Sequence, residues 1–228
     1  MEKSTLSIIL PSYNQESYLP DAIESALAQT APVKEIIVID DGSTDSSLSI
    51  AKSYEGRGVK VIAQTNRGLP SARNTGIMNA TSDYILPLDA DDMLLENCVE
   101  RIMEKAEETK ADIIAPSFKT FGLANQEVIL QGGLIAKSFV YANRIGYFSA
   151  FKREKAIAIG GYSPKMIWGW EDLHFWINML LNGATVSVIQ EPLVLYRIKE
   201  QSMITDANVH TEELLAQLKK DFPTLYES

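Results

Sequence analysis

The stretch YILPLDADD, residues 84–92, is an apolar run that ends in three carboxylates within four residues. Its first half has the composition of a buried strand, so the acidic residues are expected at that strand's carboxyl end. Carboxylates this close raise one another's pKa unless water or cations compensate their charge. The stretch therefore predicts a strand whose end carries a polar site.

Working outward from this stretch, similar apolar runs occupy residues 7–10, 35–39 and 59–62. Segments with apolar residues at helical spacing separate these runs and also follow residue 92. Strands that alternate with helices predict an α/β fold with a mostly parallel central sheet flanked by helices. Ligands of such sheets bind beyond the carboxyl ends of the strands. PSYN, DDGS and DADD all follow predicted strands, so they are expected to line one crevice.

Past residue 113 the alternation weakens, and we expect residues 118–146 to form a mobile or substrate-covering region. Further on, an amphipathic helix is predicted from about Glu171 to Leu181, and TVSVI and LVLY predict two strands. The segment from Thr211 predicts a surface helix that ends before Pro223.

Composition narrows the class of protein. The chain has 228 residues, 46% of them hydrophobic, which suits a single globular core. Its 30 acidic and 21 basic residues give a net charge of -9, so neither nucleic acid nor an anionic membrane surface is an expected partner. Cys98 is the only cysteine, and the N-terminus lacks a signal peptide's apolar core. We expect a cytoplasmic protein with no intrinsic membrane segment.

The acidic clusters have two interpretations each. Asp89, Asp91 and Asp92 suit a hard divalent ion, because Mg²⁺ and Mn²⁺ prefer carboxylate oxygens and complete their shells with phosphate and water. They also suit a turn that caps the following helix. Asp40 and Asp41, in DDGSTD, present the same choice, and the turn alternative is stronger there.

Two further pairs are candidates for a site. Tyr13 and Asn14 place a ring beside an amide, which suits a nucleobase, although both are also ordinary loop residues. Glu171 and Asp172 lie in the first turn of a predicted helix, where the positive end of the helix dipole stabilises an anionic catalytic group. The alternative is that this acidic pair only complements the dipole.

Five motifs in a fixed order carry a resemblance to a known family. ILPSYNQESYLPDAIESALAQT, EIIVIDDGSTDSS, NRGLPSARNTGI, YILPLDADD and the later GGYSPKMIWGWEDLHFWINMLLNGATVSVI with PLVLYR span Leu6 to Tyr196. This pattern resembles family 2 of the inverting nucleotide-sugar glycosyltransferases, which have a GT-A fold. The resemblance implies a GT-A domain over 1–206, with a nucleotide-binding half (1–112) and an acceptor and catalytic half (113–206), and a helical tail over 207–228.

The resemblance also implies roles for individual residues. Asp41 should accept a hydrogen bond from the nucleobase, Arg73 should offset diphosphate charge, and Asp89 should face the ribose. Asp91 should bind Mn²⁺ or Mg²⁺, which bridges the diphosphate, while the role of Asp92 stays open. The implied nucleotide-binding residues are Pro11, Ser12, Tyr13, Asn14, Asp40, Asp41, Asn66, Arg73, Asp89 and Ala90.

The implied reaction moves a sugar from a nucleoside-diphosphate sugar, by default a UDP-sugar, to an acceptor hydroxyl. Asp172 matches the family's general base, with Glu171 beside it, and Trp168 or Trp170 would contact a sugar unless both belong to the core. Lys199 stands where many members carry a histidine near the metal or diphosphate, so a diphosphate contact is expected. The implied acceptor is a saccharide or lipid-linked saccharide, used in polysaccharide or glycolipid synthesis, with the enzyme cytoplasmic or peripheral at the inner face of a membrane.

Three other classes of protein share some of these features. A Mg²⁺-dependent phosphatase of the haloacid dehalogenase type would carry its nucleophile motif after the first strand, where this chain has PSYN. A sugar nucleotidyltransferase would carry a glycine-rich loop with arginine at that place. A nucleotide-sugar-binding pseudoenzyme or scaffold is disfavoured because the binding aspartates and the base are all present.

Overall fold

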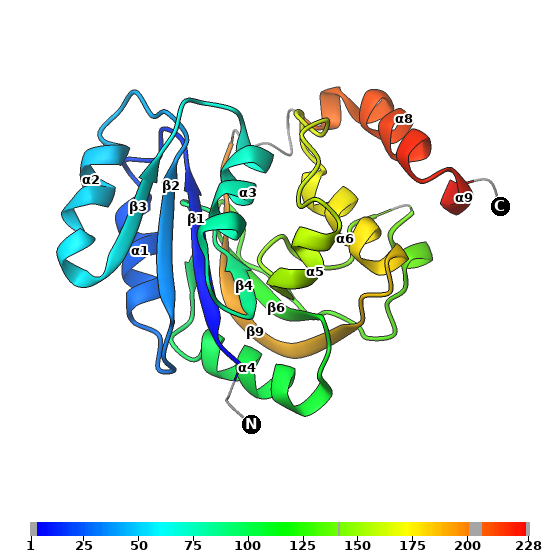
Figure 1. Cartoon of the computed structure of the whole chain (residues 1–228), viewed down its shortest axis with the longest axis horizontal. Coiled ribbons are helices and arrows are strands. Elements are labelled where there is room, and N and C mark those ends of the chain that lie inside the picture. The colour runs from blue at the N-terminus through cyan, green and yellow to red at the C-terminus, as the bar shows by residue number, and fades with distance from the viewer. Residues whose placement is uncertain (1–3, 141, 201–206, 227–228) are drawn as a thin grey trace.

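The structure is a computed structural model that describes residues 4–140, 142–200 and 207–226 (Figure 1). The strands are β1 (Leu6–Ser12), β2 (Glu35–Asp40), β3 (Val59–Ala63), β4 (Tyr84–Pro87), β5 (Met93–Leu94), β6 (Ile113–Gly122), β7 (Glu127–Val128), β8 (Ala150–Lys152) and β9 (Val186–Ile198). The α-helices are α1 (Leu19–Leu27), α2 (Ser47–Ser53), α3 (Leu69–Asn79), α4 (Cys98–Thr109), α5 (Arg153–Ala158), α6 (Glu171–Leu181), α8 (Thr211–Asp221) and α9 (Pro223–Tyr226), and short 3-10 turns lie at Glu55–Arg57 and Ala136–Phe139.

The strands form one sheet in the order β3-β2-β1-β4-β8-β6-β9-β5, with β7 paired to β6. The four strands from β3 to β4 run parallel, as do β6 and β9. Strand β8 is antiparallel to both β4 and β6, and β5 is antiparallel to β9. The predicted α/β fold with a mostly parallel sheet is therefore confirmed.

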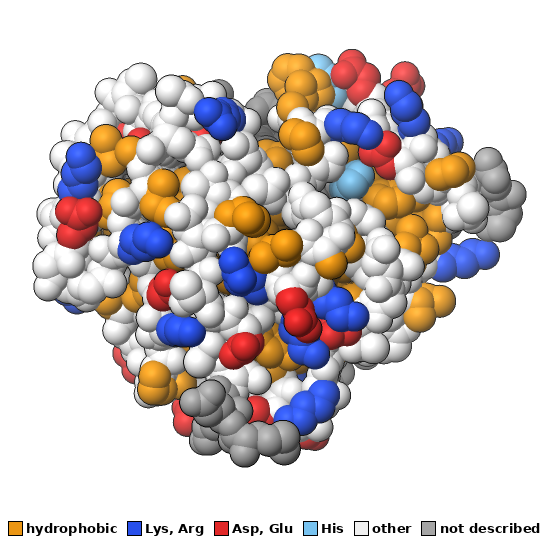
Figure 2. All heavy atoms as spheres, viewed as in Figure 1, with side chains coloured by type: hydrophobic (Ala, Val, Ile, Leu, Met, Phe, Trp, Pro, Cys, Tyr) orange, Lys and Arg blue, Asp and Glu red, His pale blue; other side chains and the backbone are white. Residues whose placement is uncertain are grey.

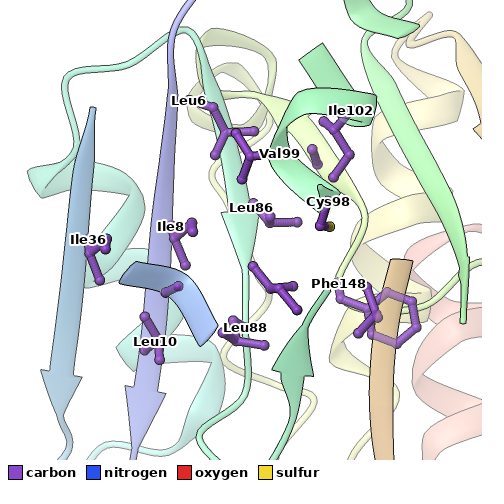
Figure 3. Packing of buried hydrophobic residues seen from close by; sticks show 14 of the residues in the cluster. Leu6, Ile8, Leu10, Ile36, Leu86, Leu88, Cys98, Val99, Ile102 and Phe148 are labelled. Atoms are coloured by element: carbon purple, nitrogen blue, oxygen red, sulfur yellow. The ribbon is translucent and has the colours of Figure 1, made fainter. Parts of the chain in front are cut away.

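Helices cover both faces of the sheet because side chains alternate along each strand. Ile8 and Leu10 point to the face covered by α1 and α4, where they share a cluster with Val99 (Figure 3). Ile9 points to the opposite face and packs in a second cluster with Ile77 of α3. Each face thus holds one layer of core.

Helix α3 lies unusually close to the sheet. A Cβ atom added to Gly76 would come within 2.9 Å of the Ile9 side chain and 3.0 Å of Ile39, so glycine is required for this approach. One turn earlier on the same helix, Arg73 is fully buried. Close packing of α3 therefore carries a charged side chain into the interior beside the carboxyl ends of the strands.

The chain beyond residue 113 differs from the expectation in two respects. TVSVI and LVLY belong to one continuous strand, β9, because register shifts opposite Ser117 accommodate Pro192 within the ladder. Strand β6 pairs with β9 as far as Gly122, so the expected mobile region starts inside an ordered strand. Helix α5 was also missing from the sequence-based prediction.

Helix α8 begins at Thr211, as predicted, and lies at the edge of the molecule (Figure 1). It is more than a surface helix, because Leu214 and Leu218 are buried in the second cluster. Asp221 at its end accepts from Lys165 Nζ at 3.0 Å and lies 3.2 Å from His174 Nε2 of α6. The described part of the tail is thus packed against α6 and the segment that precedes it.

On the face that Figure 2 presents, the described Lys and Arg side chains are interspersed with Asp and Glu. The basic side chains on this face therefore do not form one continuous patch. Among the described residues, no helix combines the length and hydrophobicity that crossing a membrane requires.

Candidate active site

Strands β1, β2 and β4 are parallel neighbours, so the segments that follow them start at the same edge of the sheet. In the PSYN motif, the first two residues belong to β1 and the last two to the loop that follows it. Pro11 and Ser12, expected in a binding loop, are buried in β1 opposite Ile39 and Asp40. Proline is accommodated because the pairing of β1 with β4 has already ended at Ile9.

Tyr13 and Asn14 form the exposed part of this motif. The Tyr13 side chain is 46% exposed, which leaves a ring surface open to a ligand. Asn14 has a positive φ of 53°, and its Oδ1 accepts from the Thr44 backbone N–H at 2.8 Å. Asn14 therefore ties the loop after β1 to the loop after β2, and contact of either residue with a base stays a prediction.

Asp41 does not present a free carboxylate to a base. It is buried and accepts from Gln64 Nε2 at 2.7 Å, from the Arg67 N–H at 3.0 Å and from the Gly68 N–H at 2.8 Å. The Asp41 carboxylate therefore fixes the loop that precedes α3, and its contact with a base stays a prediction. Asn66, in this loop, is exposed, and its Oδ1 accepts from Gly68 at 3.2 Å.

Asp40 has a different environment. Its Oδ2 accepts from the Ser43 N–H at 3.2 Å, whereas Oδ1 and the neighbouring Ser12 Oγ are buried with no hydrogen-bond partner among the described residues. A Cβ atom added to Gly42 would lie 2.8 Å from the backbone nitrogen of Asn66, so the loop after β2 touches the loop that precedes α3. Because buried polar atoms are normally paired, these two oxygens are available to water or a ligand.

Arg73 links the DADD loop to helix α6. Its guanidinium donates to Asp89 at 2.8 Å and to Glu171 at 2.5 Å, and it packs over the rings of Tyr147 and Tyr162. Arg73 was expected to offset diphosphate charge, but its own charge is already paired with two protein carboxylates. Burial raises the pKa of Asp89 to about 6, against the opposing effect of Arg73.

Two other residues of DADD are structural. Asp92 is buried and accepts from the Tyr147 hydroxyl at 2.5 Å and from the Arg197 backbone N–H at 2.6 Å. It therefore fixes the loop to β9, a role that the sequence left open. Ala90, expected near the nucleotide, is buried in the first core cluster, so its side chain faces away from the crevice.

Asp91 is the remaining carboxylate of this loop, and it forms an ion pair with Lys199. The two side chains are 20% and 23% exposed. The Arg197 Nε donates to the Asp91 backbone oxygen at 2.8 Å. Among the described residues, no group of three or more His, Cys, Asp or Glu side chains is arranged to hold a metal ion. Binding of Mn²⁺ or Mg²⁺ at Asp91 stays a prediction.

Asp172 lies in a cavity of about 450 Å³. Its Oδ2 accepts from Asn143 Nδ2 at 2.6 Å, and its Oδ1 accepts from the Leu173 N–H at 2.7 Å. Burial, reinforced by the neighbouring Glu171 carboxylate, raises the pKa of Asp172 to about 7. Asn143 was missed from sequence, because it lies in a region without periodicity. The cavity is lined by Leu69, Arg73, Asp89, Phe118, Val128, Leu130, Asn143, Arg144, Ile145, Gly146, Tyr147, Phe148, Gly169, Trp170, Glu171, Asp172, Tyr196 and Ala207.

Of the two candidate tryptophans, one lines this cavity. Trp170 does so from a left-handed conformation with φ of 57°, just before α6. Trp168 instead stacks on the ring of His210, with centroids 4.1 Å apart. The backbone turns at Gly169, whose φ is 126°, so the two indoles diverge. Trp168 therefore packs against the tail, and a sugar contact of Trp170 stays a prediction.

The cavity thus joins Asp89, Arg73, Glu171, Asp172 and Trp170, which come from distant parts of the chain. The family model described as Glycosyl transferase family 2 matches residues 7–174. The chain belongs to this family. Membership removes the phosphatase alternative, because the match includes each of the motifs from PSYN to GWED.

This family 2 glycosyltransferase has curated relatives of different lengths. It is 43% identical over 115 residues to the uncharacterized glycosyltransferase EpsJ of Bacillus subtilis (strain 168), a match that covers 50% of this chain and 33% of EpsJ. It is 28% identical over 217 residues to the putative teichuronic acid biosynthesis glycosyltransferase TuaG of the same organism, covering 88% of this chain and 82% of TuaG. The matches cover only 17% and 40% of the glycosyltransferases GlyA and GlyG of Streptococcus pneumoniae serotype 4 (strain ATCC BAA-334 / TIGR4).

Among solved structures, S. aureus TarS 1-349 in complex with UDP-GlcNAc matches with a TM-score of 0.80. The sequence identity is 22%, and the match covers 92% of this chain and 63% of that one. This similarity confirms the GT-A fold that the sequence predicted.

Proposed function

We propose that this chain transfers a sugar, with inversion, from a nucleoside-diphosphate sugar to an acceptor hydroxyl. The observation that carries the proposal is Asp172, a carboxylate with a pKa of about 7 in the cavity that Asp89 also lines. A general base is most effective when its pKa lies near the working pH. The complex of TarS with UDP-GlcNAc supports a UDP-sugar as the default donor.

In the proposed reaction, Asp172 removes the proton of the acceptor hydroxyl while its oxygen bonds to the anomeric carbon. The bond from that carbon to the diphosphate oxygen breaks on the opposite face, which inverts the configuration. Asn143 donates to one Asp172 oxygen and so turns the carboxylate into the cavity. Arg73 holds Asp89 in place for the donor ribose and holds Glu171 beside the base.

The cavity walls suit a saccharide acceptor. Phe118 and Trp170, both half-buried, offer aromatic surfaces to a sugar ring, and the buried rings of Tyr147 and Phe148 lie behind them in the cavity wall. The name of TuaG supports a role in polysaccharide synthesis. A lipid-linked saccharide is the other acceptor that we propose. With that acceptor, the enzyme would act at the inner face of a membrane. A pseudoenzyme would bind the donor with the same residues and transfer nothing.

The donor is tested by measuring apparent melting temperature with UDP, GDP, dTDP and UDP-GlcNAc, each in the presence of MnCl₂ and of EDTA. A ligand that binds the folded state at about 100 times its Kd stabilises it by roughly 2.7 kcal/mol. We expect the uridine nucleotides to raise the melting temperature by several degrees. If no nucleotide raises it in either buffer, the proposal is wrong.

The raised pKa of Asp172 predicts a pH dependence of transfer. The base acts in its ionised form, so the rate should be constant above pH 7 and fall below it, by about tenfold per pH unit. Initial rates between pH 5 and 9 measure this. The Asn143 hydrogen bond favours the ionised form, so Asn143→Ala should move the midpoint upward. A rate that stays constant down to pH 5 in the unmodified enzyme would contradict the assignment.

A further inference from the structure

We propose that Lys199 and Arg197 supply the positive charge for the donor diphosphate, so that a nucleoside diphosphate binds without a divalent cation. The inference rests on the proposed function, because it concerns the same donor. The inference starts from the ion pair between the Lys199 ammonium and the Asp91 carboxylate. That carboxylate is the group expected to bind the metal.

The end of β9 holds both cations at the loop after β4. The Arg197 backbone N–H donates to Asp92, which anchors the strand, and Arg197 Nε donates to the Asp91 backbone oxygen. Lys199 follows directly after β9, and its ion pair with Asp91 holds it at the same loop that Arg197 contacts. Both cations lie over the Tyr18 ring, at 4.6 Å for the guanidinium and 5.2 Å for the ammonium. Their placement is therefore fixed by several contacts.

The formal charges match those of a divalent ion. One lysine and one arginine carry two positive charges, the charge that Mg²⁺ or Mn²⁺ would bring to this loop. An ammonium has three N–H donors, so Lys199 can contact phosphate oxygens while it stays paired with Asp91. Among the described residues, the carboxylate that forms an ion pair with Arg197 is Asp21, at 3.8 Å, and its side chain is 62% exposed, so this pair is weak.

The other carboxylates of the loop are not available to a metal. Asp89 pairs with Arg73, and Asp92 accepts from the Tyr147 hydroxyl and the backbone of Arg197. A divalent ion at Asp91 would have to displace the Lys199 ammonium and would then be repelled by it. The residues of this loop are therefore better suited to the Lys199 and Arg197 cations than to a bound metal ion.

The test measures the Kd of UDP, GDP and dTDP by calorimetry in EDTA and in MnCl₂. We expect at least one of them to bind in EDTA, with a Kd that MnCl₂ changes by less than about threefold. Lys199→Met and Lys199→Gln should both weaken that binding in EDTA by about 10- to 100-fold, the effect of losing a hydrogen bond to a charged group. Lys105→Ala, which removes a partly exposed lysine of α4, is the control and should leave the Kd unchanged.

Each other outcome overturns the inference. Binding that requires MnCl₂ would show that a metal supplies the charge, and would leave the proposed function intact. Binding in EDTA that neither Lys199 variant weakens would remove Lys199 from the site. Absence of binding for all three nucleotides in both buffers would reject the proposed function together with this inference. Circular dichroism melts of both variants establish that a weaker Kd reflects the site and not unfolding.

Discussion

Asp172→Asn is expected to lower the rate of sugar transfer by about a thousandfold, the middle of the range for loss of a general base. Asparagine has nearly the shape of aspartate but does not accept the acceptor's proton. Its side-chain oxygen can still accept from Leu173 or Asn143, so the start of α6 should stay folded. The measurement is transfer from UDP-GlcNAc and other UDP-sugars to a saccharide acceptor, at pH 8.

The same variant should bind a nucleoside diphosphate within about twofold of the unmodified protein, because the base contacts the acceptor and not the nucleotide. Glu171→Gln serves as the matched acidic neighbour. The Glu171→Gln substitution should lower the stability of the fold because it weakens the bond between residue 171 and Arg73, but it leaves the Asp172 base in place. Retention of most of the transfer activity in Asp172→Asn would mean that another group removes the proton.

Arg73→Met is expected to lower the free energy of unfolding by about 3 to 5 kcal/mol, the cost of removing one partner from a buried ion pair. Arg73 is fully buried and pairs with two carboxylates, Asp89 and Glu171. Its loss leaves both without a cation in surroundings that already raise the pKa of Asp89. Chemical denaturation at pH 8, above the pKa of about 6 that Asp89 has in the folded protein, measures the change.

Arg57→Ala is the control for this effect. Arg57 also pairs with a glutamate, Glu24, but the two side chains are 52% and 50% exposed. Water screens an exposed ion pair, so this variant should lose little stability. Adding Glu171→Leu to Arg73→Met should recover part of the loss by removing a charge without a partner. A loss below 1 kcal/mol for Arg73→Met would show that the pairing does not stabilise the fold.

The sequence was sufficient where local patterns decide the structure. Apolar runs and helical spacing located strands β1 to β4 and helix α6 to within a few residues, because burial on a sheet or helix imposes a fixed period. The same patterns predicted two strands where the structure has only β9. Register shifts around Ser117 let β9 run past Pro192 as one strand. The patterns also gave no signal at Asn143, which lies outside any strand or helix.

The sequence by itself determined the α/β class, the family and the edge of the sheet at which polar residues gather. It did not determine which of those residues face a ligand, because that depends on partners brought from elsewhere in the chain. Arg73 and Glu171 are 98 residues apart, and only their packing shows that the arginine's charge is already neutralised. In the same way, only the fold places Lys199 on Asp91. A charge acquires its partner, its burial and hence its pKa through tertiary contacts, and a linear pattern records none of these.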